Sequence, residues 1–161
     1  MSNLIDSLVA WFEGTSLHAT MQTVEWAVPA VQTVHILAIA AVFASSVALA
    51  LRTLQLAGTD WSPAQWGRRL NGWVGWGLLI LLISGLFMIT GEPARSLNNV
   101  MFQTKMLLLL LAIGLFWALA RGVRRLDRPE QGAPGAVRLL AALTVLVWLA
   151  IIICGRWIAY T

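Results

Sequence analysis

Long apolar stretches separated by short polar segments dominate the sequence. Four of them approach the ~20 residues that an α-helix needs to cross the hydrocarbon core of a bilayer. They cover residues 28–51, 72–90, 102–120 and 136–153. None alternates polar and apolar positions with the period of two that a membrane β-strand requires. The pattern therefore predicts an all-α fold, with residues 1–161 forming one membrane domain built as a four-transmembrane-helix bundle.

A weaker helical pattern precedes the first span, within residues 1–26. Leu4, Leu8 and Phe12 share one face of a helix over residues 3–13. Ser16 can cap a second helix that continues to about Trp26. We expect short N-terminal amphipathic helices that lie at the membrane surface.

The composition agrees with a membrane protein and excludes an ordinary soluble domain. Hydrophobic residues make up 59% of the chain and charged residues only 11%, and the mean hydropathy is +0.78. A single cysteine, Cys154, excludes an intrachain disulfide framework.

The net charge of +4 is concentrated beside the spans, in the segments 52–69 and 121–138. Nucleic acid is therefore not expected as a partner, because this distribution follows the positive-inside rule. No Lys or Arg precedes the first span. We predict a multi-pass protein of the bacterial inner (cytoplasmic) membrane, with both termini in the periplasm.

This topology gathers polar groups at the outer half of the bundle. The side chains concerned are His35, Glu92, Lys105 and Arg156, one from each span or its outer end. His35 lies about 10 Å into its span at 1.5 Å per residue. An ionisable residue at such a depth marks a functional site by default. The inner halves of the spans carry almost nothing ionisable, so the candidate site belongs to the outer half.

An imidazole on a transmembrane helix suits haem iron, so His35 is a candidate axial ligand of haem b. Lys105 and Arg156 can pair with the haem propionates, or they can extend to the nearby interface. The alternative for His35 is a hydrogen bond inside the membrane, with Gln32 as a nearby partner. The chain lacks a C-x-x-C-H motif, which excludes covalent haem attachment.

Several residues are candidates for the second axial ligand of the iron. His18, the other histidine of the chain, can fold over the bundle. Met88, Met106 or Lys105 can serve instead, or the iron can be five-coordinate. Copper held by His35 and Cys154 with one of these methionines is a further alternative, although no ligand spacing supports it.

The first span has two distinct faces. Ala40, Ala44 and Ala48 form a seam of small residues of the kind that lets helix backbones approach closely. The opposite face carries His35, together with Gln32, Ile39, Val42 and Ser46. We expect one face to pack within the bundle and the other against a cofactor or another protomer.

Three stretches resemble an uncharacterised family of small four-helix bacterial inner-membrane proteins: WAVPAVQTVHILAIAAVFASSVALALRTL, LNNVMFQTKMLLLLLAI and GRWIAY. More distantly, a His in the first span and a Lys opening the third are similar to HemJ-type protoporphyrinogen oxidases and CopD-like proteins. This resemblance implies haem contact for His35 and a substrate or propionate role for Lys105. Ala38 and Ile39 stand where the HemJ type has an arginine, so it implies haem binding rather than protoporphyrinogen oxidation.

The sequence thus favours a haem b-binding protein that transfers electrons near the periplasmic side, with quinol or a periplasmic redox partner. Besides the lipid bilayer and a quinone, we expect a homo-oligomer or a larger membrane complex as its setting. One alternative is a non-catalytic accessory subunit of such a complex. Another is a small metal-handling or transport protein, which would have to oligomerise to form a pore.

Overall fold

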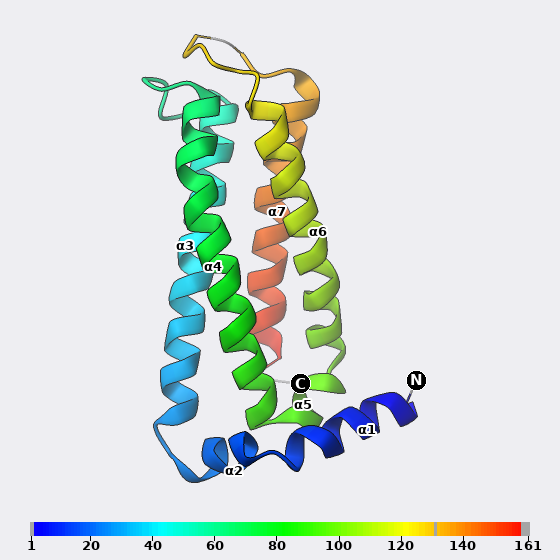
Figure 1. Ribbon diagram of the computed structural model, residues 1–161. Helices are drawn as coiled ribbons and strands as arrows, with labels where there is room; N and C mark the ends of the chain where they lie inside the picture. The colour runs from blue at the N-terminus through cyan, green and yellow to red at the C-terminus, as the bar shows by residue number, and fades with distance from the viewer. Residues whose placement is uncertain (1, 131, 159–161) are drawn as a thin grey trace.

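The computed structural model describes residues 2–130 and 132–158, whose backbone forms seven helices and no strand (Figure 1). The short helices are α1 (Ser2–Glu13), α2 (Ser16–Thr23) and α5 (Pro93–Leu97). The long helices are α3 (Ala27–Thr53), α4 (Pro63–Gly91), α6 (Val100–Val123) and α7 (Gly135–Trp157). All four long helices have the length and apolar composition to cross a membrane. The predicted all-α fold with four spanning helices is confirmed.

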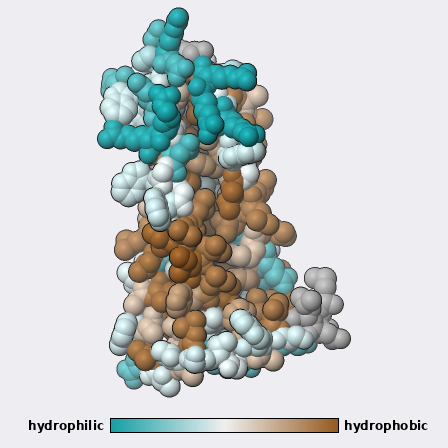
Figure 2. Space-filling model, viewed as in Figure 1, coloured by the Kyte–Doolittle hydropathy of each residue, from teal (hydrophilic) through white to brown (hydrophobic). Residues whose placement is uncertain are grey.

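The long helices form two antiparallel pairs, α3 with α4 and α6 with α7, and α3 also packs along α7. Helices α4 and α6 meet only sparsely. Helices α1 and α2 lie across one end of the bundle (Figure 1), which we call the capped end. The opposite end carries the loops 54–62 and 124–134 and is the most hydrophilic part of the surface in Figure 2, above a broad apolar band. We call it the arginine end.

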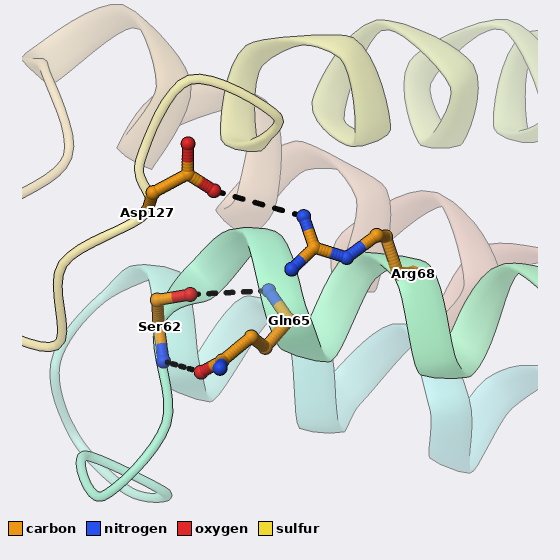
Figure 3. A network of polar contacts seen from close by, with 4 residues as sticks. All are labelled: Ser62, Gln65, Arg68 and Asp127. Atoms are coloured by element: carbon orange, nitrogen blue, oxygen red, sulfur yellow. Dashed lines mark hydrogen bonds and ion pairs between the residues drawn. The ribbon is translucent and has the colours of Figure 1, made fainter.

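Helix α4 begins well before the apolar stretch that predicted it. Ser62 forms a capping box: its Oγ accepts a hydrogen bond from the Gln65 backbone at 3.2 Å, and Gln65 Oε1 accepts one from the Ser62 backbone at 2.8 Å (Figure 3). Pro63 occupies the first turn, where its missing N–H leaves no bond unmade. From this cap, α4 continues without a break into the span.

The core lies where α3 meets its neighbours. Val42 and Leu49 of α3 are fully buried, as are Leu119 and Val123 of α6. The closest approach is at Gly77, where an added Cβ would overlap Cγ2 of Val42. The glycine at this point lets the Val42 side chain of α3 pack directly against the backbone of α4.

Of the two faces of α3, the one that carries His35 packs into the bundle. Val42 and Ser46 on this face are fully buried. In contrast, Ala40 and Ala44 of the alanine seam are exposed on the outside of the bundle. Ala48, the third residue of the seam, is only partly buried, so most of the seam faces away from the bundle.

Arg52 joins the two loops of the arginine end. Its side chain is fully buried. Its Nε donates a hydrogen bond to the Trp61 carbonyl, and its Nη2 donates one to the Pro129 carbonyl at 2.6 Å. Both acceptors are backbone groups, so this buried cation holds the two loops together, while its Nη1 has no hydrogen-bond partner among the described residues.

The N-terminal helices close the capped end. The N-cap of α2 is Thr15, whose hydroxyl accepts a hydrogen bond from the His18 backbone at 3.2 Å. Ser16 was the predicted cap, but it already lies inside the helix, because the extended backbone suited to a cap occurs at Thr15. Helix α5 was not predicted, and Pro93 begins it directly after α4.

The contact between Gly77 and Val42 can be tested by overpacking. We expect Gly77→Ala to lower the free energy of unfolding by about 1–3 kcal/mol, since the new methyl group overlaps Val42. Val42→Ala in the same background should recover part of this loss. Reversible unfolding in mixed micelles, followed by circular dichroism, measures both effects.

Gly75→Ala is the matched control, because a Cβ at Gly75 meets no atom within 4 Å. It should leave stability unchanged or raise it by up to about 1 kcal/mol through helix propensity. Equal destabilisation by both glycine substitutions would contradict the proposed close approach.

Candidate functional site

His35 is held by a hydrogen bond that crosses from α3 to α4. Its Nδ1 lies 2.7 Å from Oγ of Ser84. The Ser84 hydroxyl donates its one hydrogen to the Ile80 carbonyl, at 2.6 Å. The contact with His35 therefore requires Nδ1–H as the donor. In the neutral imidazole this leaves the lone pair on Nε2, which is then available to bind a metal or accept a proton.

Gly85 gives the imidazole room beside α4. A Cβ built on Gly85 would lie 3.6 Å from Cε1 of His35. The ring thus lies against the backbone of α4 at Ser84 and Gly85. A large side chain at position 85 would occupy the space next to this ring.

Lys105 enters the same region from α6. It shares one helical face with Ala112, Phe116 and Val123, which are buried in the core. Its side chain therefore points into the bundle and is half-buried. The Lys105 ammonium lies close enough to His35 to interact electrostatically with the imidazole.

Helix α7 completes the cluster with Cys154 and Gly155. A Cβ added at Gly155 would lie 3.8 Å from Nζ of Lys105, so this glycine also lies beside the ammonium group. Cys154, the residue before it, is partly buried and lies within electrostatic range of Lys105. Within residues 2–130 and 132–158, no acceptor forms a hydrogen bond or ion pair with Nζ of Lys105. The cluster therefore contains a cation with no anionic partner in the described chain.

Helices α3, α6 and α7 are less buried around this cluster than in the middle of the bundle. Buried residues of α3 begin at Ala38 and those of α6 begin at Ala112. In α7 the buried residues end at Ile151. Between these positions and the capped end, His35, Lys105 and Cys154 are only partly buried. The polar groups thus lie in the part of the three helices that is less buried than the middle of the bundle.

An apolar groove between α3 and α4 reaches the edge of the site. Its volume is about 280 Å³, and its walls include Val34, Ile80 and Phe87. Ser84, whose hydroxyl holds His35, also lines it. The groove surface is almost wholly apolar, so an apolar molecule dissolved in the bilayer can lie against this part of α3 and α4.

The structure does not bring His18 to His35. The Nδ1–H of His18 donates to the Thr90 carbonyl at 2.7 Å, while Nε2 of Gln22 donates to the Gly91 carbonyl at 2.6 Å. Both side chains satisfy carbonyl groups at the end of α4, which have no partner inside the helix. Thr90 lies six residues beyond Ser84, about 9 Å along the helix axis. In this arrangement His18 caps α4, and the two histidines are anchored at different heights.

Gln32 and Arg156 also lie apart from the centre of the cluster. Gln32 is exposed, and the hydrogen-bond partner of His35 is Ser84 rather than this amide. Arg156 is exposed too, about 100° around α7 from Gly155. Of the predicted cofactor-binding residues, the structure therefore places His35 and Lys105 together.

Three residues of the cluster were not anticipated: Ser84, Gly85 and Gly155. The sequence contains only a weak indication of these residues. Ser84 and Gly85 interrupt an apolar run of α4, and Gly155 directly precedes Arg156. Small residues in a membrane span predict close packing, but they do not indicate which helix or side chain approaches them.

Among the described residues, no group of three or more His, Cys, Asp or Glu side chains could hold a metal ion. A cofactor that brings most of its own ligands, as haem does, needs only one or two protein ligands.

The bond between His35 and Ser84 yields a stability prediction. Ser84→Ala removes the acceptor that joins α3 to α4, and a double-mutant cycle with His35→Ala should give a coupling of about 0.6 kcal/mol. Ser45→Ala is the control, since the Ser45 hydroxyl bonds only within its own helix, to the Ala41 carbonyl at 2.8 Å. A cycle of Ser45→Ala with His35→Ala should show no coupling. Equal values for the two cycles would refute the interhelical bond.

Comparison with known proteins places the chain in a family without assigning an activity. No curated protein and no solved structure matches it. A family model matches residues 9–161, which include the four spanning helices and every residue of the cluster. The chain belongs to a family of unknown function (DUF6644).

Proposed function

We propose that the protein binds haem b at the capped end of its bundle and transfers electrons there, with His35 as an axial ligand. The observation that carries the proposal is an oriented imidazole near a cation that has no acceptor among residues 2–130 and 132–158. His35 and Lys105 come from α3 and α6, and the ammonium group lies within electrostatic range of the imidazole. Their positions also agree with the distant similarity to HemJ-type proteins.

The hydrogen bond to Ser84 suits metal ligation. Histidine ligands of metals commonly donate their other ring N–H to an oxygen, which fixes the tautomer and the ring orientation. In this chain the Nδ1–H of His35 has such a partner in Ser84 Oγ. Nε2, through its lone pair, would then bind the iron. The haem b would supply one-electron transfer.

Lys105 suits the acidic edge of the same cofactor. A charged side chain inside a membrane span needs a partner or a water-filled cavity. The described chain gives Lys105 no acceptor, and Gly155 leaves the space beside its ammonium group free of a side chain. A haem propionate would provide the missing negative charge.

The proposal uses His35 as the single histidine ligand. His18 is engaged at the end of α4 through the Thr90 carbonyl, and Arg156 is exposed on α7. The apolar groove that reaches Ser84 favours a bilayer-soluble quinol as electron partner. The arginine-rich segments support placement in a bacterial inner membrane, with the capped end in the periplasm.

The absorption spectrum of the purified full-length protein tests this proposal. Expressed with an adequate haem supply, the wild type should show a Soret band and release haem b on extraction. His35→Ala should lose the band. Ser84→Ala should bind haem about 10-fold more weakly, which is the usual cost of losing the hydrogen-bond partner of a ligand. Lys105→Met should also lower the haem content, because the propionate loses its cation.

His18→Ala and Gln32→Ala are the controls, and both should retain the spectrum. A colourless wild-type protein, even after addition of hemin, would overturn the proposal. In that case the His35–Ser84 contact would be only an interhelical hydrogen bond, as in an accessory subunit. Retention of the Soret band by His35→Ala would also exclude the assigned ligand.

A further inference from the structure

A second cavity lies at the opposite end of the molecule, between α4 and α6. Its volume is about 410 Å³. Ala64 and Gly67 of α4 and Ala120 of α6 form part of its wall. These small side chains, together with the sparse contact between the two helices, leave room for a bound group.

Two arginines lie at the mouth of this cavity. Arg68 and Arg124 both line it and are exposed. Arg68 makes an ion pair of 3.6 Å with Asp127, shown in Figure 3, in which both side chains are largely exposed. An exposed pair of this length contributes little stability, so the Arg68 guanidinium remains able to donate elsewhere. The three groups together carry a net charge of about +1.

Asn71 adds an unsatisfied polar atom to the same cavity. It lies one helical turn further into the span than Arg68. Its Oδ1 is buried and has no hydrogen-bond partner in the described chain, although the residue lines the cavity. A buried acceptor without a donor costs about 1–3 kcal/mol. A bound molecule that carries a hydroxyl or ammonium donor would remove this cost.

We propose that this cavity binds the headgroup of an anionic phospholipid, of the phosphatidylglycerol type. The phosphate would accept hydrogen bonds from Arg68 and Arg124, and a glycerol hydroxyl would donate to Asn71. Basic pockets between transmembrane helices on the cytoplasmic side are suited to anionic headgroups. The single negative charge of this lipid matches the net charge of the arginine pair with Asp127.

The surrounding residues place the cavity at the headgroup level of the bilayer. The Arg121 guanidinium lies 3.5 Å from the ring centre of Trp117, and that of Arg69 lies 4.8 Å from the ring centre of Trp61. Tryptophan and arginine mark the membrane interface in this way. Deeper in the bundle, α4 and α6 expose Leu82 and Leu110, which gives the acyl chains an apolar surface. A lipid can therefore occupy the cavity without leaving the bilayer.

Native mass spectrometry of the full-length protein in detergent provides the test. After delipidation, the protein is titrated with dioleoyl phosphatidylglycerol or dioleoyl phosphatidylcholine. We expect preferential binding of one phosphatidylglycerol. Arg124→Gln should weaken this binding about 5-fold, which corresponds to about 1 kcal/mol for one arginine near the membrane surface. Asn71→Leu should also weaken it, because the larger apolar group fills part of the cavity.

Arg125→Gln is the matched control. It removes the same charge from the neighbouring exposed residue, which does not line the cavity, and should change the affinity less than 2-fold. Thermal unfolding of each variant verifies that it is folded. If Arg124→Gln and Arg125→Gln lowered the affinity for phosphatidylglycerol equally, general surface charge would explain the binding and the proposal would be overturned. Equal binding of phosphatidylcholine, or complete competition by equimolar inorganic phosphate, would overturn it as well.

Discussion

The close approach of α3 to α4 is the constraint on which the rest of the structure depends. Lipid tails are as apolar as leucine, so burial alone does not drive two helices together within a bilayer. Gly77 allows Val42 to pack directly against the backbone of α4. This contact sets the distance and rotation of the two helices. Because His35 and Ser84 lie further along the same pair, their hydrogen bond depends on that rotation.

The second helix pair supplies the other half of the candidate site. Phe116 and Val123 orient α6 by burying one of its faces in the core, and Lys105 lies on that face. The ammonium group must therefore point inward, where Gly155 of α7 lies next to it. The tight core and the loose capped end are thus complementary: the core fixes the helix rotations, and the capped end holds the polar groups that these rotations direct inward.

The same reasoning explains which features the sequence could predict. The four spans follow from apolar length alone, and the depth of His35 follows from its position in the first span. Its partner on α4 cannot be predicted in this way, because residues 72–83 of α4 are apolar on every side and hydropathy cannot specify the rotation of that stretch. Ser84 was therefore missed and Gln32 was considered instead. His18 was a candidate ligand for a similar reason: the sequence does not show that its ring meets the Thr90 carbonyl at the end of α4.

Arg52 and Lys105 show how one residue class can have two different roles in this bundle. Each is a cation on a spanning helix, and the bilayer requires an acceptor for both. Arg52 finds its acceptors in the backbone of its own loops, at Trp61 and Pro129. These bonds tie the two loops together, although Nη1 of Arg52 has no hydrogen-bond partner among the described residues. Lys105 has no acceptor among the described residues, and this is why we propose a bound anionic group beside it. The two cations thus differ in their surroundings: Arg52 is bonded to loop carbonyl groups, whereas Lys105 lies beside a glycine of another helix.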